Sequence, residues 1–343
     1  VAKVDNLKYE TLQAAINAAK GGSTVRLLAN VVEDVVINKS ITLDLGGKTL
    51  TGSGYDGVFQ ITGEGAKVLI KNGDVVAVEQ KGSAGKYAMA IWACAADCEV
   101  TLEDLDVSQK ITSVNDPQMD MIYTSGGTII INSGSFESGT PAWTLNCKDA
   151  AYKAGTANII VNGGNNQAEG VGTSFVAAGV GVDHVDGKFT AKSRMTAQVV
   201  DADGKSVKAF EKLSAALTDA TAGQTVKLLN DVADETFVMV KAGVTLDLAG
   251  KNITGATMLY VTGTIVDTAA SATKGAVSAE AYMIASSVGS GYTPIYSGTG
   301  YQFYKLGMNI MKKNASEDST TVVFAPKAKG EWTAERNAFR NLL

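Results

Sequence analysis

The chain has 343 residues, of which 45% are hydrophobic, so it is long enough for two domains and apolar enough to fold around a core. Its 35 acidic residues outnumber its 30 basic ones, and the four arginines are scattered, which argues against nucleic acid or anionic lipid as a partner. No apolar run reaches the roughly 20 residues that cross a bilayer, so membrane insertion is not predicted either.

The first predicted element is a short extended stretch with a turn, AKVDNLKY, followed by an amphipathic helix over residues 9–20. Leu12, Ile16 and Ala19 fall on one face of this helix, and the pair Gly21 and Gly22 is a typical stop signal. The segments TVRLL and ITLDLGGKTLTG follow as strands.

The same order of elements returns in the second half of the chain. The stretch AQVVDADGKSVKAF precedes a second amphipathic helix over residues 210–222, and TVKLL and VTLDLAGKNITG follow it. Asp203 and Gly204 in the first of these segments form a typical hairpin turn. The copied unit is therefore a hairpin, a helix and then strands.

Five short β-branched runs recur within the first half, and each is followed by a corner and a second short apolar run. The runs begin at Thr42, Val68, Val100, Ile129 and Ile159. This pattern favours the stacked coils of a parallel β-helix, whose inward residues lie on those of the previous coil. A β-sandwich also gives short strands at turn-rich intervals and stays open as the alternative.

The order of TLQAAINAAKGG, a TVRLL strand and ITLDLGGKTLTG resembles the N-terminal cap and first coils of the pectate-lyase-like right-handed parallel β-helix superfamily. It is most similar to uncharacterised secreted or surface β-helix proteins of gut bacteria and their phages. The segments GTIIINSGSFES and EGVGTSFVAAG extend the resemblance over residues 1–190, and residues 197–268 follow it less closely. Gly164, Asn165 and Asn166 depart from the pattern, so the last coil is expected to end differently.

The repeat and the resemblance together predict an all-β protein of three parts. Residues 1–195 and 196–289 are expected to form two right-handed β-helix units, each with an N-terminal capping helix. An uncovered end of a coil stack is a sheet edge that can pair with another chain, and an amphipathic helix is one way to cover it. A chain that starts two coil stacks needs the cap twice.

Residues 290–343 are predicted to be a β-rich segment with strands from Tyr292 and from Ser319, followed by a helix that ends at Leu343. This helix ends on two bulky apolar residues without a polar stop signal, so we expect the segment to belong to a longer domain. The chain begins with Val1 instead of methionine, which suggests that a leader was removed and is compatible with export.

The catalytic candidates are four aspartates, Asp104, Asp106, Asp116 and Asp120. Glycoside hydrolysis uses two carboxylates roughly 5–10 Å apart, and adjacent coils could supply them. A lyase of the pectate type would need several aspartates for calcium and a strong base, and no arginine lies near these residues in sequence. We therefore interpret the four as solvated loop residues. Asp44 and its copy Asp247 are assigned a corner or capping role.

The cysteines and the single histidine do not indicate a catalytic or metal site. Cys94, Cys98 and Cys147 are interpreted as small buried residues, with a disulfide from Cys94 to either of the others as the alternative. His184 has no nucleophile motif beside it, and the cysteine spacing lacks a second ligand pair, so neither a metal nor a cofactor is predicted. The aromatics Trp92, Trp143, Tyr123 and Phe136 are interpreted mainly as packing residues, with a sugar-stacking platform as the alternative.

These observations predict a non-catalytic extracellular or cell-surface module that acts in structure or adhesion, as a subunit of a surface filament or assembly. Self-association, other surface proteins and glycans are its expected partners. Two alternatives remain: a polysaccharide-cleaving lyase or hydrolase, which would gather carboxylates in a groove, and a phage fibre or tailspike on the virion surface, which would bury a large threefold interface.

Overall fold

The computed structural model describes residues 1–53, 55–81, 86–112, 119–140, 143–166, 174–185, 188–192, 194–233, 235–270, 275, 277–284, 292–297 and 300–305. The fold is mainly β with parallel sheets. The chain divides into two compact units, residues 1–177 with 184–192, and residues 178–183 with 193–343.

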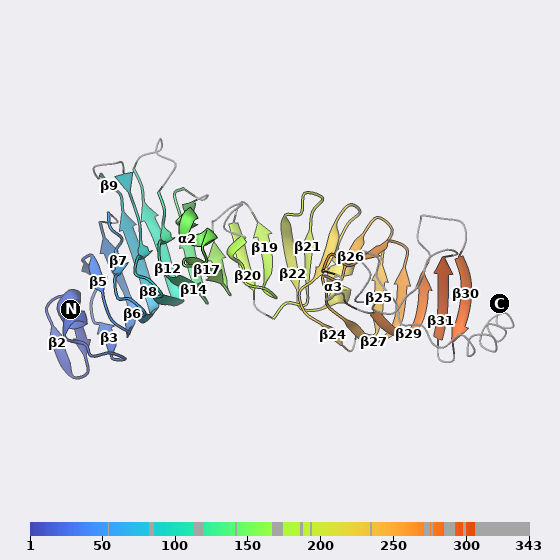
Figure 1. Cartoon of the computed structure of the whole chain (residues 1–343), viewed down its shortest axis with the longest axis horizontal. Coiled ribbons are helices and arrows are strands. Elements are labelled where there is room, and N and C mark those ends of the chain that lie inside the picture. Colours follow the sequence, from blue (N-terminus) through green and yellow to red (C-terminus); the bar gives the residue numbers. More distant parts are fainter. Residues whose placement is uncertain are drawn as a thin grey trace. The chain divides into compact units, whose positions relative to one another are not determined.

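The large sheet of the first unit is built from the runs that recur in the sequence. Its parallel strands are β3 (Thr24–Leu27), β6 (Ile41–Gly52), β8 (Lys67–Val78), β12 (Glu99–Lys110), β14 (Thr128–Ile131), β15 (Gly134–Glu137), β17 (Asn158–Val161) and β18 (Gly164–Asn166). Figure 1 shows β6, β8 and β12 side by side. Ile41 lies opposite Val68, Val68 opposite Val100, Val100 opposite Ile129, and Ile129 opposite Ile159. Each recurring run therefore pairs with the next one.

The long strands bend at residues with a left-handed backbone. Gly46, Asn72 and Asp104 have φ angles of 60°, 60° and 47°. Glycine, asparagine and aspartate adopt this conformation at the lowest cost. Polar side chains join the successive bends: Asn72 Nδ2 donates to Asp44 Oδ1 (3.2 Å), and Asn162 Nδ2 donates to Asn132 Oδ1 (3.0 Å). The sequence thus sets bends in the long strands, and neighbouring bends bind one another.

A second parallel sheet contains the short strands β5 (Val35–Ile37), β7 (Phe59–Ile61), β11 (Ile91–Ala93), β13 (Ile122–Thr124) and β16 (Leu145–Cys147). In chain order these strands alternate with strands of the large sheet, so the chain passes back and forth between the two sheets. The first and third residues of each strand are buried and the middle residue is more exposed. The core of the unit therefore lies on the inward face of both sheets.

Both sheets of the first unit are covered at their starting edge. The hairpin of β1 (Ala2–Val4) and β2 (Leu7–Tyr9) adds to β3 in antiparallel fashion. Helix α1 (Leu12–Ala18) contacts β5 and buries Leu12, Ala15 and Ile16. The helix is shorter than the predicted 9–20, because Tyr9 belongs to β2 and the Thr11 side chain caps the helix by accepting from Ala14 N.

The second unit repeats this order. The hairpin of β21 (Ala197–Val200) and β22 (Ser206–Phe210) covers β23 (Thr225–Leu228). In parallel order, β26 (Thr245–Asp247) pairs with β23, and β28 (Thr264–Val266) pairs with β26. Helix α3 (Leu213–Asp219) contacts β25 (Phe237–Val240). Parallel to β27 (Ile253–Val261) lie β24 (Val232–Ala233), β25 and β29 (Val277–Ile284). The predicted helix 210–222 is present but shorter, since Phe210 ends β22.

The remaining described elements include β4 (Val31–Val32), which pairs in parallel with β6 of the large sheet, and further short elements. The latter are β9 (Gln80–Lys81), β10 (Lys86–Tyr87), α2 (Asp149–Lys153), β19 (Gly181–Val185), β20 (Lys188–Lys192), β30 (Tyr292–Ser297) and β31 (Gly300–Lys305). The parallel order of the large sheet ends at β18, where β20 pairs in antiparallel fashion at the departing Gly164–Asn166 segment. β30 and β31 form an antiparallel hairpin. The predicted strand from Ser319 and the final helix lie outside the described residues.

Candidate functional site

Two of the four candidate aspartates lie on β12 of the large sheet, and both are exposed. Asp104 occupies the corner: its backbone N donates to Ser133 Oγ (2.8 Å), and this hydroxyl donates to Asp104 Oδ1 (2.8 Å). Asp106 lies opposite Asp74 of β8 and Ser135 of β15. These contacts give Asp104 a role in joining two corners of the sheet.

Asp120 lies elsewhere, directly before β13 of the second sheet. It is half-buried, and its Oδ1 accepts a hydrogen bond from Asn146 Nδ2 (2.9 Å). Burial raises the pKa of the Asp120 carboxyl to about 6, although the bond from Asn146 acts in the opposite direction. Asp116 lies outside the described residues. Two of the described candidates therefore lie in the large sheet, and the third lies before a strand of the second sheet.

The raised pKa of Asp120 gives a testable pH dependence. A folded-state pKa of about 6 against an ordinary value of 3.8 means that the folded chain holds the proton more tightly than the unfolded chain. Stability should therefore fall as pH rises from about 4 to about 6, by at most about 3 kcal/mol. Asp120→Asn should remove this slope and stabilise the protein at pH 7.5. Urea unfolding of the wild type and of Asp120→Asn at pH 5 and pH 7.5 measures the change in stability between the two pH values. An equal change in both proteins would contradict the prediction.

The repeated aspartates Asp44 and Asp247 make equivalent corner bonds. Asp44 Oδ1 accepts from Gly46 N (2.9 Å), and Asp247 Oδ1 accepts from Ala249 N (2.9 Å). Gly46 and Ala249 both have a left-handed backbone, with φ angles of 60° and 46°. Both carboxylates thus fix a tight bend, within β6 for Asp44 and at the end of β26 for Asp247, in agreement with the corner role expected from their repetition.

All three cysteines are free thiols. Cys98 and Cys147 are buried, and Cys94 is half-buried, with Sγ directed to Ile61 O at 3.0 Å. Burial raises the pKa of the Cys147 thiol to about 12 and also raises the pKa values of Cys94 and Cys98. Raised pKa values leave little reactive thiolate at neutral pH. The structure therefore contains none of the alternative disulfides and gives the cysteines a packing role.

The candidate aromatics divide between the core and the outer surface. Phe136 is fully buried, as a packing residue would be, and Trp143 is half-buried. Trp92 and Tyr123 are the middle residues of β11 and β13, lie directly opposite each other and are half-buried. Their ring centroids are 6.5 Å apart at an interplanar angle of 42°. Trp92 Nε1 donates to Ser125 Oγ (3.0 Å).

One repeated feature escaped the sequence prediction. Both oxygens of Glu33 accept from the start of α1, from Leu12 N and Gln13 N at 2.8 Å each. Lys39 Nζ donates to Asn17 O (3.0 Å) and Ala19 O (3.1 Å) at the other end of the helix. An acidic group at a helix N-terminus and a basic group at its C-terminus are both favourable. The residues that flank β5 on its two sides thus hold the two ends of the capping helix.

In the second unit, equivalent hydrogen bonds hold the two ends of α3, but the one at its N-terminus is longer. Glu235 Oε1 accepts from Ser214 N at 3.4 Å, and Lys241 Nζ donates to Thr218 O at 2.8 Å. The sequence signal is the spacing Glu-x5-Lys, which occurs as EDVVINK in one copy and ETFVMVK in the other. This signal is visible only when the two copies are aligned.

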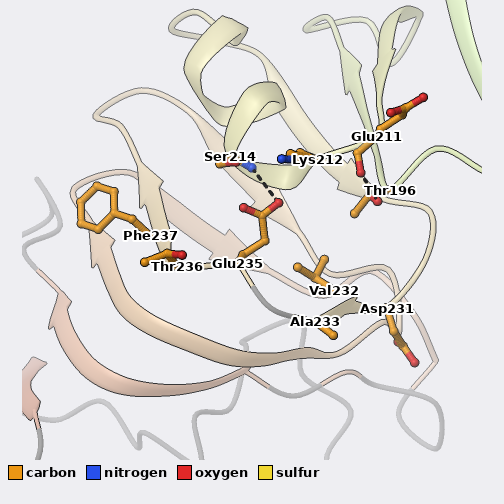
Figure 2. A pocket seen from close by; sticks show the side chains of 10 residues that line it. All are labelled: Thr196, Glu211, Lys212, Ser214, Asp231, Val232, Ala233, Glu235, Thr236 and Phe237. Atoms are coloured by element: carbon orange, nitrogen blue, oxygen red, sulfur yellow. Dashed lines mark hydrogen bonds between the residues drawn. The ribbon is translucent and has the colours of Figure 1, made fainter.

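A pocket of about 700 Å³ lies at the start of α3 (Figure 2). Figure 2 shows Glu235 directed at Ser214, whereas the carboxylates of Glu211 and Asp231 point away from it. Asp231 Oδ1 accepts from Asn252 N (2.8 Å). Because its acidic side chains do not converge, this pocket offers no pair of carboxylates for acid–base chemistry. It is lined by Thr196, Glu211, Lys212, Ser214, Asp231, Val232, Ala233, Glu235, Thr236 and Phe237.

Among the described residues, no three His, Cys, Asp or Glu side chains gather in a group that could hold a metal ion. His184 is half-buried in β19. No helix in the described part of the chain has the length and apolar character needed to span a membrane. The fold and these sites define a mainly β protein with capped parallel sheets. In comparisons with known proteins, no family model, curated protein or solved structure matches the chain.

Proposed function

We propose that this protein is a non-catalytic structural or adhesion module of the cell surface or extracellular space, built from two capped right-handed parallel β-helix units. The repeated cap carries this proposal. Both units begin with a hairpin and a helix that cover the starting edges of parallel sheets. Strand–crossover–strand connections in parallel sheets are almost always right-handed, which supports the handedness.

Stacked coils of this kind suit a mechanical or display role. Each coil contacts only its neighbours, so the stack gains length in proportion to its residues, and loops on its flanks can vary without disturbing the core. The covered edges also suit a protein that must stay soluble outside the cell, because an open edge would pair with other chains. In this role the protein is a stiff spacer or a subunit of a surface assembly.

The distribution of carboxylates supports a non-catalytic role over polysaccharide cleavage. Asp104 binds the corner at Ser133, and Asp120 lies on the other sheet against Asn146. Two carboxylates that face one substrate bond are the minimum for glycoside hydrolysis. Asp104 and Asp120, held at these separate places in the fold, do not form such a pair.

The experiment is incubation of the purified chain with neutral and acidic polysaccharides, followed by measurement of new reducing ends and of unsaturated products. We expect no depolymerisation. The matched variant replaces Asp104, Asp106, Asp116 and Asp120 together by alanine, so that any product release can be assigned to these carboxylates. Product release by the wild type that disappears in this variant would assign the protein to the enzymes instead.

A further inference from the structure

A row of polar and aromatic side chains crosses the outer face of the second sheet in the first unit. Gln60 lies opposite Trp92, Trp92 opposite Tyr123, and Tyr123 opposite Asn146. All four are half-buried middle residues of their strands, between neighbours that face the core. Because the register is parallel and unbroken, the four side chains form one continuous band.

The band does not follow the composition expected of a purely structural surface. Large aromatics on a solvent-facing row leave apolar ring surface in water, which costs free energy unless something covers it. Inward positions already supply the core of the same strands, with Phe59, Ile91 and Ile122 fully buried. Packing of the sheet therefore does not require Trp92 and Tyr123 on the outside.

The groups around the two rings match a sugar. Aromatic rings offer a flat apolar surface with a polar tip for contact with a partner that is apolar on one side and wet on the other. The amide side chains of Gln60 and Asn146 lie at the two ends of the band. Two further polar groups lie next to it: Ser125 Oγ accepts from Trp92 Nε1, and Asp120 Oδ1 accepts from Asn146 Nδ2. Pyranose rings present an apolar face of C–H groups and a rim of hydroxyls. The apolar face can pack on the aromatic rings of the band, and the hydroxyls can bind its polar side chains.

The nearby charges narrow the partner further. Burial raises the pKa of the Tyr123 hydroxyl, and the negative charges of Asp120 and Asp149 raise it further, so both carboxylates lie close enough to act on this ring. A uronic acid or sulfated sugar would be repelled at this position. We infer that the band of Gln60, Trp92, Tyr123 and Asn146 binds a neutral glycan; this inference deepens the adhesion role and rests on that proposed function.

The test is affinity electrophoresis of the full chain in gels that contain a soluble glucan, mannan, xylan or, for comparison, polygalacturonate, with fluorescence titration of each polysaccharide that retards it. We expect at least one neutral polysaccharide to bind and polygalacturonate not to bind. Trp92→Ala and Tyr123→Ala should each weaken binding about tenfold or more, the loss typical of a central aromatic contact. Trp92→Phe should retain most of the affinity because it keeps a flat ring.

Tyr152→Ala is the matched control, since Tyr152 is an exposed aromatic of α2 that packs against Phe175 and lies outside the band. If Trp92→Ala does not fold, Gln60→Arg tests the band by placing a bulky charged group at its end. The inference is wrong if no neutral polysaccharide binds, or if binding survives Trp92→Ala or Gln60→Arg in folded protein. If glycan binding fails in this test, the protein can still be a non-catalytic structural module. The release of new reducing ends from a polysaccharide would instead overturn the proposed function itself.

Discussion

Deletion of residues 9–20 will make the protein aggregate, because it removes the helix that covers the starting edge of the second sheet. Leu12 and Ile16 in this helix are fully buried. Loss of two such side chains from the core costs about 3–6 kcal/mol, which is comparable to the entire stability of many domains. The same deletion uncovers the backbone of β5.

The backbone edge of β5 is covered by the side chain of Gln13, which makes the hydrogen bonds that a neighbouring strand would make. Gln13 Nε2 donates to Val36 O (3.0 Å), and Val36 N donates to Gln13 Oε1 (2.7 Å). An uncovered strand edge is a template for pairing with another chain. Light scattering and the soluble fraction after purification will measure the effect of the deletion.

A single substitution separates the effect of the open strand edge from the effect of the lost core packing. Gln13→Ala keeps the helix but frees both backbone groups of Val36, so we expect a loss of about 1–2 kcal/mol and faster aggregation. Ser214→Ala, at the matching position of α3, should have little effect. Deletion of residues 115–118, which were expected to form a loop, serves as the length control. A soluble and unchanged monomer after deletion of residues 9–20 would refute the capping role.

The second large effect is expected from Glu33→Ala. Its carboxylate accepts two short bonds from the first turn of α1, so the variant leaves two part-buried N–H groups without their partner. Lost N-terminal caps and charge-assisted hydrogen bonds suggest a cost of about 2 kcal/mol to the first unit. Glu235→Ala removes a single bond of 3.4 Å and should cost less than about 1 kcal/mol.

Hydrogen exchange read by mass spectrometry can assign these losses to each unit. Peptides that contain Leu12 and Gln13 should exchange faster in Glu33→Ala, while those that contain Ser214 should not change. Glu235→Ala should show the reverse pattern with a smaller amplitude. Equal effects of the two substitutions would show that the shorter bonds in the first unit do not contribute more.

The sequence by itself determined the order of elements in both units. Helix periodicity around Leu12 and Leu213, the Asp203–Gly204 turn and the β-branched runs are local signals, and each acts within a few residues. The recurring runs from Thr42 to Ile159 also predicted which strands would be neighbours, and the structure pairs them in parallel. The corner role of Asp44 could be inferred because Asp247 repeats it.

Only the tertiary structure decided which side chains meet between segments far apart in the sequence. Glu33 reaches Leu12 at the start of α1, Trp92 lies opposite Tyr123, and Asp120 lies before β13 whereas Asp104 lies in β12. The physical reason is that the lengths of the loops between successive strands vary, and a shift of one residue in a parallel pair moves a side chain to the other face. A local pattern fixes the strand, but the register between distant strands depends on packing of the whole core.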